Sequence, residues 1–427
     1  MLDINLIREN PQKIKDALAK KEWDVDFTEL LIWDAKRKEL LVQVENNKAE
    51  QNRLSKSVPE IKKSGGNVAE IFAKVKDLGE KNKNNEVLLG EIETKIADFL
   101  AVLPNVPDED LLKGGKENNK VVSTFKEKPV FDFKIKDHVE LAESLGLIDF
   151  ERGAKIAGRG SWIYTGLGAR LEWALLNLFI TEHLKDGYEF LLPPHLLNEE
   201  SGYVAGQFPK FKEDVFWLKS VEPERFLLPT AETALVNFHR AEILSEDDLP
   251  KKYFAYTPCY RKEAGSYRTE ERGTIRGYQF NKVEMFQYTT QENSDVAFAE
   301  LVAKAENLIK QLGLHYQVSK LAAGDVSHSM ARTYDIEVYI PSIGIYKEVS
   351  SVSNARDYQA RRGMIRYRDK ESGKTKFVHT LNGSGLATSR IFPALLEQHQ
   401  QADGSVLIPE CLWPFMGGIK VLKPLKK

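Results

Sequence analysis

The chain has 427 residues, enough for two or three domains, and 42% of them are hydrophobic, which is sufficient for a large buried core. Its 61 basic and 63 acidic side chains give a formal net charge of -2, which argues against a strongly basic nucleic-acid binder but leaves room for a local basic patch. The two cysteines, Cys259 and Cys411, form no C-x-x-C pair, so neither a disulfide framework nor a zinc site is expected.

The chain carries no targeting or membrane signal. Asp3, Arg8 and Glu9 interrupt the first ten residues, which therefore do not resemble a signal peptide. No stretch of about 18 apolar residues occurs, so no contact with a membrane is expected. We therefore predict a reducing, cytoplasmic location.

Residues from about 28 to 100 are predicted to form an antiparallel helical hairpin. Their apolar positions follow a sustained 3.5-residue period, typical of a coiled coil, and residues 64–67 interrupt that period with a turn signal. When the two halves are folded onto each other, Trp33 faces Phe99 and Ile61 faces Ile71. Periodicity alone favours a dimerisation coiled coil or a spacer over an RNA-binding arm.

The polar interruptions of the two halves coincide in the same register. Gln51 faces Asn82 and Asn47 faces Asn85, which predicts one shared polar layer that fixes the pairing of the helices. Pro59 predicts that the first helix kinks or ends near the tip of the hairpin.

A second domain is predicted to begin after residue 103, where residues 103–107 and the pair Gly114 and Gly115 break the helical pattern. Strands are expected at 254–260, 278–288, 334–339 and 345–349, and helices at 169–185, 231–241 and 295–312. This mixture lacks regular βαβ alternation, so the predicted class is α+β, an antiparallel sheet with flanking helices. No Walker-type loop is present, so a nucleotide would have to bind without one.

Two of the expected strands carry a pattern that suits a nucleoside triphosphate. Residues at even separation share a face of a strand, so one sheet face would gather arginines, an aromatic ring and acids. Arginine forks bind phosphate oxygens and a flat ring stacks on a base, although a cross-strand ladder of ion pairs is the alternative. The residues concerned are Arg261, Lys262, Glu263, Arg276, Phe280 and Glu284.

Three further segments have functional potential and an ordinary structural alternative. Residues 230–232 suit a binding site, but taken alone they are better explained as a helix N-cap with an acid in the first turn. Residues 348–351 offer the carboxylate of Glu348 and the hydroxyl of Ser351 to Mg²⁺, or form a serine-rich strand end. The run 383–390 would let backbone approach a ligand at its two glycines, or mark a tight turn.

The order of these segments resembles the class II aminoacyl-tRNA synthetases. An Arg-x-Glu strand, a long loop, a Glu-bearing strand and a Gly-x-Gly run with a downstream arginine follow one another as they do in that class. The exact strings resemble the seryl-tRNA synthetases of bacterial type, and the resemblance covers essentially the whole chain. The strings are those at 230–232, 257–266, 279–285 and 379–386, together with the hairpin and the first four residues.

This resemblance implies a role for each matching residue. Arg261 and Arg390 would act on the phosphates of ATP, Phe280 would stack on adenine, and Pro194 would mark the interface of a homodimer. Magnesium ligands would be Glu348 and Ser351. The remaining ATP-binding residues would be Lys262, Glu263, Arg276, Val349 and Ser350, and the serine pocket would consist of Thr230, Ala231, Glu232, Glu284 and Ser384.

The implied function is a serine–tRNA ligase with L-serine, ATP, Mg²⁺ and tRNA(Ser) as partners, and with no zinc. Residues 1–103 would bind tRNA through the hairpin, and residues 104–427 would be catalytic. The sequence leaves open whether tRNA(Sec) is also charged, and whether Glu232 or Glu284 binds the serine ammonium. A ligase that charges a carrier protein and an inactive paralogue that only binds RNA are the alternatives.

Overall fold

The computed structural model describes residues 1–65, 67–262 and 272–426, and within them the chain packs as two units. One unit comprises Leu2–Asp16 and Asp24–Leu103. The other comprises Met1, Ala17–Trp23 and the chain from Pro104 onward. No helix in the described part of the chain is long and apolar enough to cross a bilayer.

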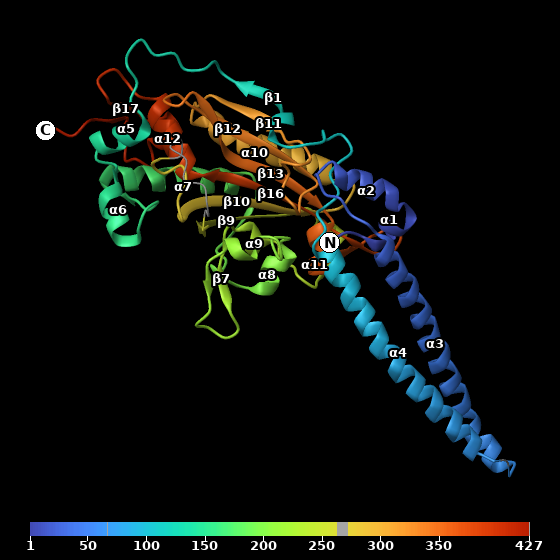
Figure 1. The fold of residues 1–427 in the computed structure, drawn as a ribbon. Helices are drawn as coiled ribbons and strands as arrows, with labels where there is room; N and C mark the ends of the chain where they lie inside the picture. Colours follow the sequence, from blue (N-terminus) through green and yellow to red (C-terminus); the bar gives the residue numbers. More distant parts are fainter. Residues whose placement is uncertain (66, 263–271, 427) are drawn as a thin grey trace. The chain divides into compact units, whose positions relative to one another are not determined.

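The first unit is dominated by two long helices, α3 (Thr28–Lys63) and α4 (Ala69–Ala101), which run side by side as a hairpin (Figure 1). The rings of Trp33 and Phe99 meet edge to face at 6.1 Å, and Lys48 pairs with Glu86 at 2.8 Å. The expected antiparallel coiled-coil arm is therefore confirmed. Two short helices precede it, α1 (Ile4–Glu9) and α2 (Pro11–Ala19).

The arm contains hydrogen-bonded amides at the predicted polar layer, but the bonds do not join the residues predicted to face each other. Each amide bonds a partner about one to two helical turns away from the residue predicted to face it, because a long side chain reaches along the axis and the Cα register does not fix its partner. The bonds run from Asn47 Nδ2 to Asn82 Oδ1 (3.0 Å), from Gln51 Nε2 to Val75 O (2.8 Å) and from Asn85 Nδ2 to Gln43 Oε1 (3.2 Å).

The first helix also does not end at Pro59. Helix α3 continues through that proline to Lys63. Proline removes one backbone hydrogen bond, and so close to the end of a 36-residue helix this single loss does not stop the helix.

The second unit is built on an eight-stranded sheet in the order β1-β11-β12-β13-β16-β10-β9-β4 (Figure 1). Every neighbouring pair is antiparallel except β4 with β9. The predicted α+β class is therefore confirmed. The strands are β1 (Lys120–Phe125), β4 (Glu189–Leu191), β9 (Lys251–Tyr260), β10 (Gln279–Thr289), β11 (Tyr316–Lys320), β12 (Arg332–Ile340), β13 (Ile345–Arg356) and β16 (His379–Ala387).

Helices cover both faces of this sheet. One face packs with α7 (Gly166–Lys185), α10 (Ser294–Gln311) and α12 (Thr388–Gln398) in the largest apolar cluster of the described chain. The other face packs with the short helices α8 (Glu199–Val204), α9 (Glu232–Leu235) and α11 (Tyr358–Gly363). The first face therefore forms the main apolar core. The second face also carries buried polar side chains, among them Glu232 and Glu284.

The helix expected over 231–241 is much shorter in the structure. Helix α9 ends at Leu235, and the chain continues as tight turns with i to i−3 backbone bonds, such as Phe238 to Leu235. Ala241 then has φ 63°, a left-handed conformation that a continuing helix does not allow.

Smaller elements complete the second unit. They are η1 (Lys116–Asn118), α5 (His138–Ser144), β2 (Ile148–Asp149), α6 (Phe150–Ala157), β3 (Ile163–Tyr164), β5 (Leu196–Asn198), η2 (Lys212–Asp214), β6 (Trp217–Leu218), β7 (Arg225–Leu227), β8 (Ile243–Ser245), η3 (Glu246–Asp248), β14 (Arg366–Arg368), β15 (Thr375–Phe377), β17 (Val406–Leu407), η5 (Glu410–Leu412) and β18 (Val421–Leu422).

Candidate active site

Alternate residues of strand β10 direct their side chains toward the candidate site. Val283 and Met285 point into the apolar core, whereas Phe280, Lys282 and Glu284 face the opposite side, where Lys282 and Glu284 form an ion pair. The ladder with β16 shifts register between Lys282 and Glu284, so a bulge lies in the middle of the site. The alternation expected from the sequence is therefore present.

Glu284 is the centre of a buried polar pocket. Its side chain is fully buried, and Asn382 Nδ2 donates to one of its carboxylate oxygens at 3.0 Å. Ser384 Oγ and Thr230 Oγ1 donate to the other oxygen at 3.3 and 3.5 Å. Asn382 also donates to Glu232 at 3.3 Å, so the structure brings together Thr230, Glu232, Glu284 and Ser384, as the sequence predicted.

Three residues of this pocket were missed from the sequence. Lys282 forms an ion pair with Glu284 and donates to Thr230 Oγ1 at 2.7 Å. Gln359 Nε2, on α11, donates to Glu232 Oε1 at 2.8 Å, and Asn382 bridges the two carboxylates. Strand alternation could have found Lys282 and Asn382, because each lies two residues from a predicted site residue, but no sequence signal pointed to Gln359.

The electrostatics of the pocket affect Glu232 most. Burial, followed by repulsion from Glu284, raises the pKa of Glu232 to about 7. The hydrogen bond from Gln359 and the charges of Lys282 and Arg261 act in the opposite direction. Glu232 can therefore change its charge near neutral pH, when a cation enters the pocket.

A second group of side chains surrounds the edge of this pocket. The guanidinium of Arg261 lies 5.2 Å from the centre of the Phe280 ring. Arg390, on α12, donates to the carbonyl of Glu348 at 2.8 Å. Arg276 lines the same small cavity as these four residues, so the three arginines and the ring converge as expected.

A larger cavity of about 450 Å³ opens beside them. Thr230, Glu232, Arg261 and Arg276 contribute to its wall, so it joins the acidic pocket to the arginines. Its wall also includes Ser327 and Met330, to which no motif pointed.

Not every predicted site residue has its side chain in this cluster. Lys262 Nζ donates to the carbonyl of Glu213 in η2 at 2.8 Å, Ala231 packs in the apolar cluster with α8, and Ser350 Oγ donates to the carbonyl of Ser384 at 2.6 Å. Val349 is 1% exposed and belongs to the core, although it also lines the small cavity. Glu263 lies outside the described residues.

Glu348 and Ser351 lie with Asp335 in a cluster of oxygen atoms. Ser351 Oγ is 2.7 Å from Asp335 Oδ1 and 3.0 Å from Glu348 Oε1. Burial and repulsion from Glu348 hold the pKa of Asp335 well above its usual value. Burial would also raise the pKa of Glu348, but Arg390 and Ser351 outweigh it and lower that pKa.

A single hydroxyl lies between these two carboxyl groups. Ser351 has one proton to donate, so at any one time its Oγ donates either to Asp335 or to Glu348. The lowered pKa of Glu348 favours an anionic carboxylate beside this hydroxyl oxygen, at the edge of the arginine cluster. Such hard oxygen donors fit Mg²⁺, which takes one or two carboxylates and completes its shell with water and phosphate oxygens.

The two glycines of the 383–390 run lie within strand β16, not in a turn. A Cβ atom at Gly385 would lie 2.3 Å from His183 Nε2, on α7. The glycine therefore allows a close approach between the sheet and a core helix, and the neighbouring Ser384 takes part in the pocket.

Two family models match the chain. The model for the tRNA synthetase class II core domain (G, H, P, S and T) matches residues 216–399, which include both side-chain groups. The model for the seryl-tRNA synthetase N-terminal domain matches residues 1–107, which include the arm.

Full-length relatives agree with these models. The chain is 61% identical over 425 residues to serine–tRNA ligase 2 of Clostridium acetobutylicum, with 99% of this chain and all of the relative covered. Among solved structures, seryl-tRNA synthetase from Pyrococcus horikoshii, complexed with ATP, has a TM-score of 0.91 at 33% identity, with both chains covered completely. The serine-tRNA ligase of Naegleria fowleri in complex with AMP has a TM-score of 0.89 at 26% identity, covering all of this chain and 99% of its own. This chain belongs to the seryl-tRNA synthetases, a family of class II aminoacyl-tRNA synthetases.

Proposed function

We propose that this chain activates L-serine with ATP to seryl-adenylate and then transfers the seryl group to the 3′ end of tRNA(Ser). The observation that carries the proposal is the junction of a buried acidic pocket with a cluster of three arginines, in a chain of this family. The acidic pocket suits a small amino acid with an ammonium and a hydroxyl group, and the arginines suit a triphosphate.

The pocket has the donors and acceptors that serine requires. Glu232 and Glu284 accept hydrogen bonds from the ammonium and the hydroxyl of the substrate, with Thr230 and Ser384 beside them. Alanine lacks the hydroxyl and would leave buried polar groups without a partner, so a pocket of this kind rejects it strongly. Rejection of threonine instead requires steric closure around its additional methyl group.

The first reaction is an in-line displacement at the α-phosphorus of ATP. An oxygen of the serine carboxylate forms the new bond to phosphorus, and the bond to the leaving pyrophosphate breaks. The carboxylate is already ionised, so the protein needs no general base. Arg261 and Arg390 stabilise the charge on the phosphates, Arg276 assists them, and Phe280 stacks on the adenine ring.

Glu348 and Ser351 would hold Mg²⁺, with Asp335 behind them. When bound, the ion neutralises phosphate charge and orients the pyrophosphate group for departure. The contact from Arg390 to the carbonyl of Glu348 places the arginine beside these oxygens, so one cluster of residues serves the same phosphates.

The second reaction brings in tRNA, whose terminal ribose hydroxyl attacks the carbonyl carbon of seryl-adenylate and releases AMP. We propose that residues 1–103 form the tRNA-binding domain and that the arm contacts the long variable arm of tRNA(Ser). Residues 104–427 form the catalytic domain, and the active form is a homodimer whose interface includes Pro194. Because tRNA and ATP are used where translation occurs, the same proposal places the enzyme in the cytoplasm.

The test is serine-dependent exchange of pyrophosphate into ATP in magnesium buffer, with and without tRNA. Exchange with serine, but not with alanine, and without any need for tRNA supports activation by this pocket. Arg261→Ala should lower the exchange rate by roughly a hundredfold or more, as does loss of other charge-stabilising groups. Absence of exchange with serine would favour the inactive, RNA-binding paralogue.

A further inference from the structure

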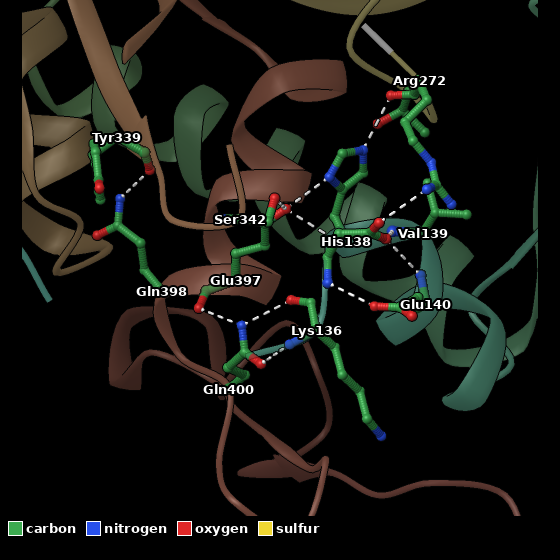
Figure 2. Close-up of polar contacts among 12 residues, drawn as sticks. Lys136, His138, Val139, Glu140, Arg272, Tyr339, Ser342, Glu397, Gln398 and Gln400 are labelled. Carbon is green, nitrogen blue, oxygen red and sulfur yellow. Dashed lines mark hydrogen bonds and ion pairs between the residues drawn. The ribbon is translucent and has the colours of Figure 1, made fainter. Parts of the chain in front are cut away.

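His138 and Glu397 form a buried polar cluster outside the proposed active site (Figure 2). His138 is the first residue of α5, and Glu397 lies near the end of α12. The carboxylate of Glu397 is fully buried and accepts four hydrogen bonds, so its position is tightly fixed. The donors are His138 N (2.9 Å), His138 Nδ1 (2.8 Å), Ser342 N (2.8 Å) and Ser342 Oγ (2.9 Å).

The other ring nitrogen of His138 contacts the main chain at Arg272, ahead of strand β10. Nε2 lies 3.1 Å from the carbonyl oxygen of Arg272 (Figure 2). A carboxylate and a carbonyl both accept, so the ring makes both contacts as a donor when each nitrogen carries a proton. Asp137, the N-cap of α5, pairs with the guanidinium of Arg272 at 3.1 Å. The start of α5 therefore holds both the main chain and the side chain of Arg272.

Residues 273–275, which follow Arg272, are held by α5 and α12 as well. Gly273 has φ 78°, and a Cβ there would lie 2.4 Å from His138 Nε2, so its backbone packs directly on the ring. Thr274 Oγ1 donates to the carbonyl of Ser389 at 2.8 Å, and Arg390 Nε donates to the carbonyl of Ile275 at 3.4 Å. The following residue is Arg276.

Helix α12 connects the two ends of this arrangement. Its first turn carries Arg390 and bonds Thr274 and Ile275, whereas its last turn carries Glu397, which fixes His138. Residues 272–275 are therefore fastened to one rigid helix at two places, directly and through the histidine ring. A turn held in this way has little freedom to change the direction of its next side chain.

We propose that His138 is a positioning residue for ATP, which with Glu397 holds residues 272–275 so that Arg276 and Arg390 face the phosphates together. The inference rests on the proposed function, because it assigns these arginines to ATP. His138 itself contacts no substrate. It acts on the nucleotide side of the site, and the serine pocket around Glu284 has no bond to this segment among the described contacts.

The test compares His138→Phe with the matched variant His315→Phe in the serine-dependent exchange assay. His315 is equally buried, at 5% exposed, and both of its ring nitrogens are bonded, to Phe125 O, Lys126 O and Tyr346 Oη. We expect His138→Phe to raise the KM for ATP and lower kcat, each by about tenfold, since a misplacement of about 1 Å costs up to about a hundredfold. The KM for serine should change less than about twofold, and His315→Phe should alter neither.

A second variant guards against a general loss of folding. Thr274→Val removes the bond to Ser389 on the same segment and leaves His138 intact, so it should raise the KM for ATP in the same selective way. Equal rises in the KM for serine and for ATP, or the same defect in His315→Phe, would overturn the inference. Absence of exchange in the unmodified protein would instead reject the proposed function, so the two failures are distinguishable.

Discussion

Glu232 and Glu284 lie in one buried pocket, and the burial of Glu232, together with its repulsion by Glu284, should make serine binding depend on pH. The pKa of Glu232 is about 7, so below that pH the residue carries a proton that the serine ammonium must displace. The KM for serine should fall about tenfold per unit as pH rises from 5.5 to 7 and then level off, because one proton is released on binding. Exchange kinetics measure this directly, and a flat profile would contradict it. Glu232→Gln should abolish the slope.

Lys282 also affects the protonation of Glu232. Its ammonium lies between Glu284 and Thr230, and it lowers the pKa of Glu232. Lys282→Met should therefore raise the KM for serine at pH 7 by about tenfold or more, since a charged hydrogen bond contributes about 1.5–3 kcal/mol. It should also move the levelling-off point of the pH profile to higher pH. Lys252→Met removes a lysine paired with Glu300 outside the pocket, and it should leave both measurements unchanged.

Glu348 provides a prediction for the metal. Glu348→Gln keeps the size of the side chain but removes the negative charge beside Ser351. The magnesium concentration for half-maximal exchange should rise about tenfold or more, because Mg²⁺ depends on its few carboxylate ligands. The control is Glu306→Gln. Glu306 lies on α10 and accepts a hydrogen bond from Tyr316 on β11. An unchanged magnesium titration for Glu348→Gln would exclude it as a ligand.

At the scale of elements, the arm should be separable from the chemistry. The rings of Trp33 and Phe99 lie 6.1 Å apart at its base, so residues 35–95 can be replaced by a short glycine-serine turn. Exchange should keep a kcat/KM within about twofold of the full chain, because activation takes place on the sheet. Charging of tRNA(Ser), measured with labelled serine, should be lost. Equal loss of both activities would contradict a tRNA-binding role for the arm.

Local sequence patterns were sufficient to predict those elements whose conformation follows from their own residues. Strong alternation predicted the strand at 278–288, observed as Gln279–Thr289, and the heptad pattern predicted the arm. The helix predicted over 231–241 was wrong, because its apolar residues pack around α9 and the following turns, not along one helical stripe. The hydrogen-bond partners of Asn47 and Gln51 could not be predicted from the register, because the reach of the side chains decides them.

The site could be predicted only as far as its residues lie in motifs. Phe280 and Glu284 were found because they share a strand face, and Lys282 obeys the same rule although it was not singled out. Gln359 and Asp335 come from α11 and β12, and only the packing of the whole sheet brings them to Glu232 and Ser351. The spacing of residues in the sequence does not predict contacts of this kind.

At the scale of the whole molecule, a hydrophobic surface should mark the interface of the proposed homodimer. Leu192 is 74% exposed and lies with Pro194 and Phe238 around an apolar cavity of about 420 Å³. Leu192→Asp should shift the mass measured by sedimentation from two chains to one at micromolar concentration. Val296→Asp is the control, since that valine is 72% exposed on α10 and belongs to another surface. A two-chain mass for Leu192→Asp would contradict this interface.

The alternation along β10 has a consequence for how this gene can change. Substitutions alter one side chain at a time, and each leaves its neighbours in place. The loss or gain of a single codon just before residue 283 would instead reverse the strand from that point on, turning Val283 and Met285 toward the pocket and Glu284 into the core. Members of this lineage should therefore vary in composition along β10 but keep its length constant.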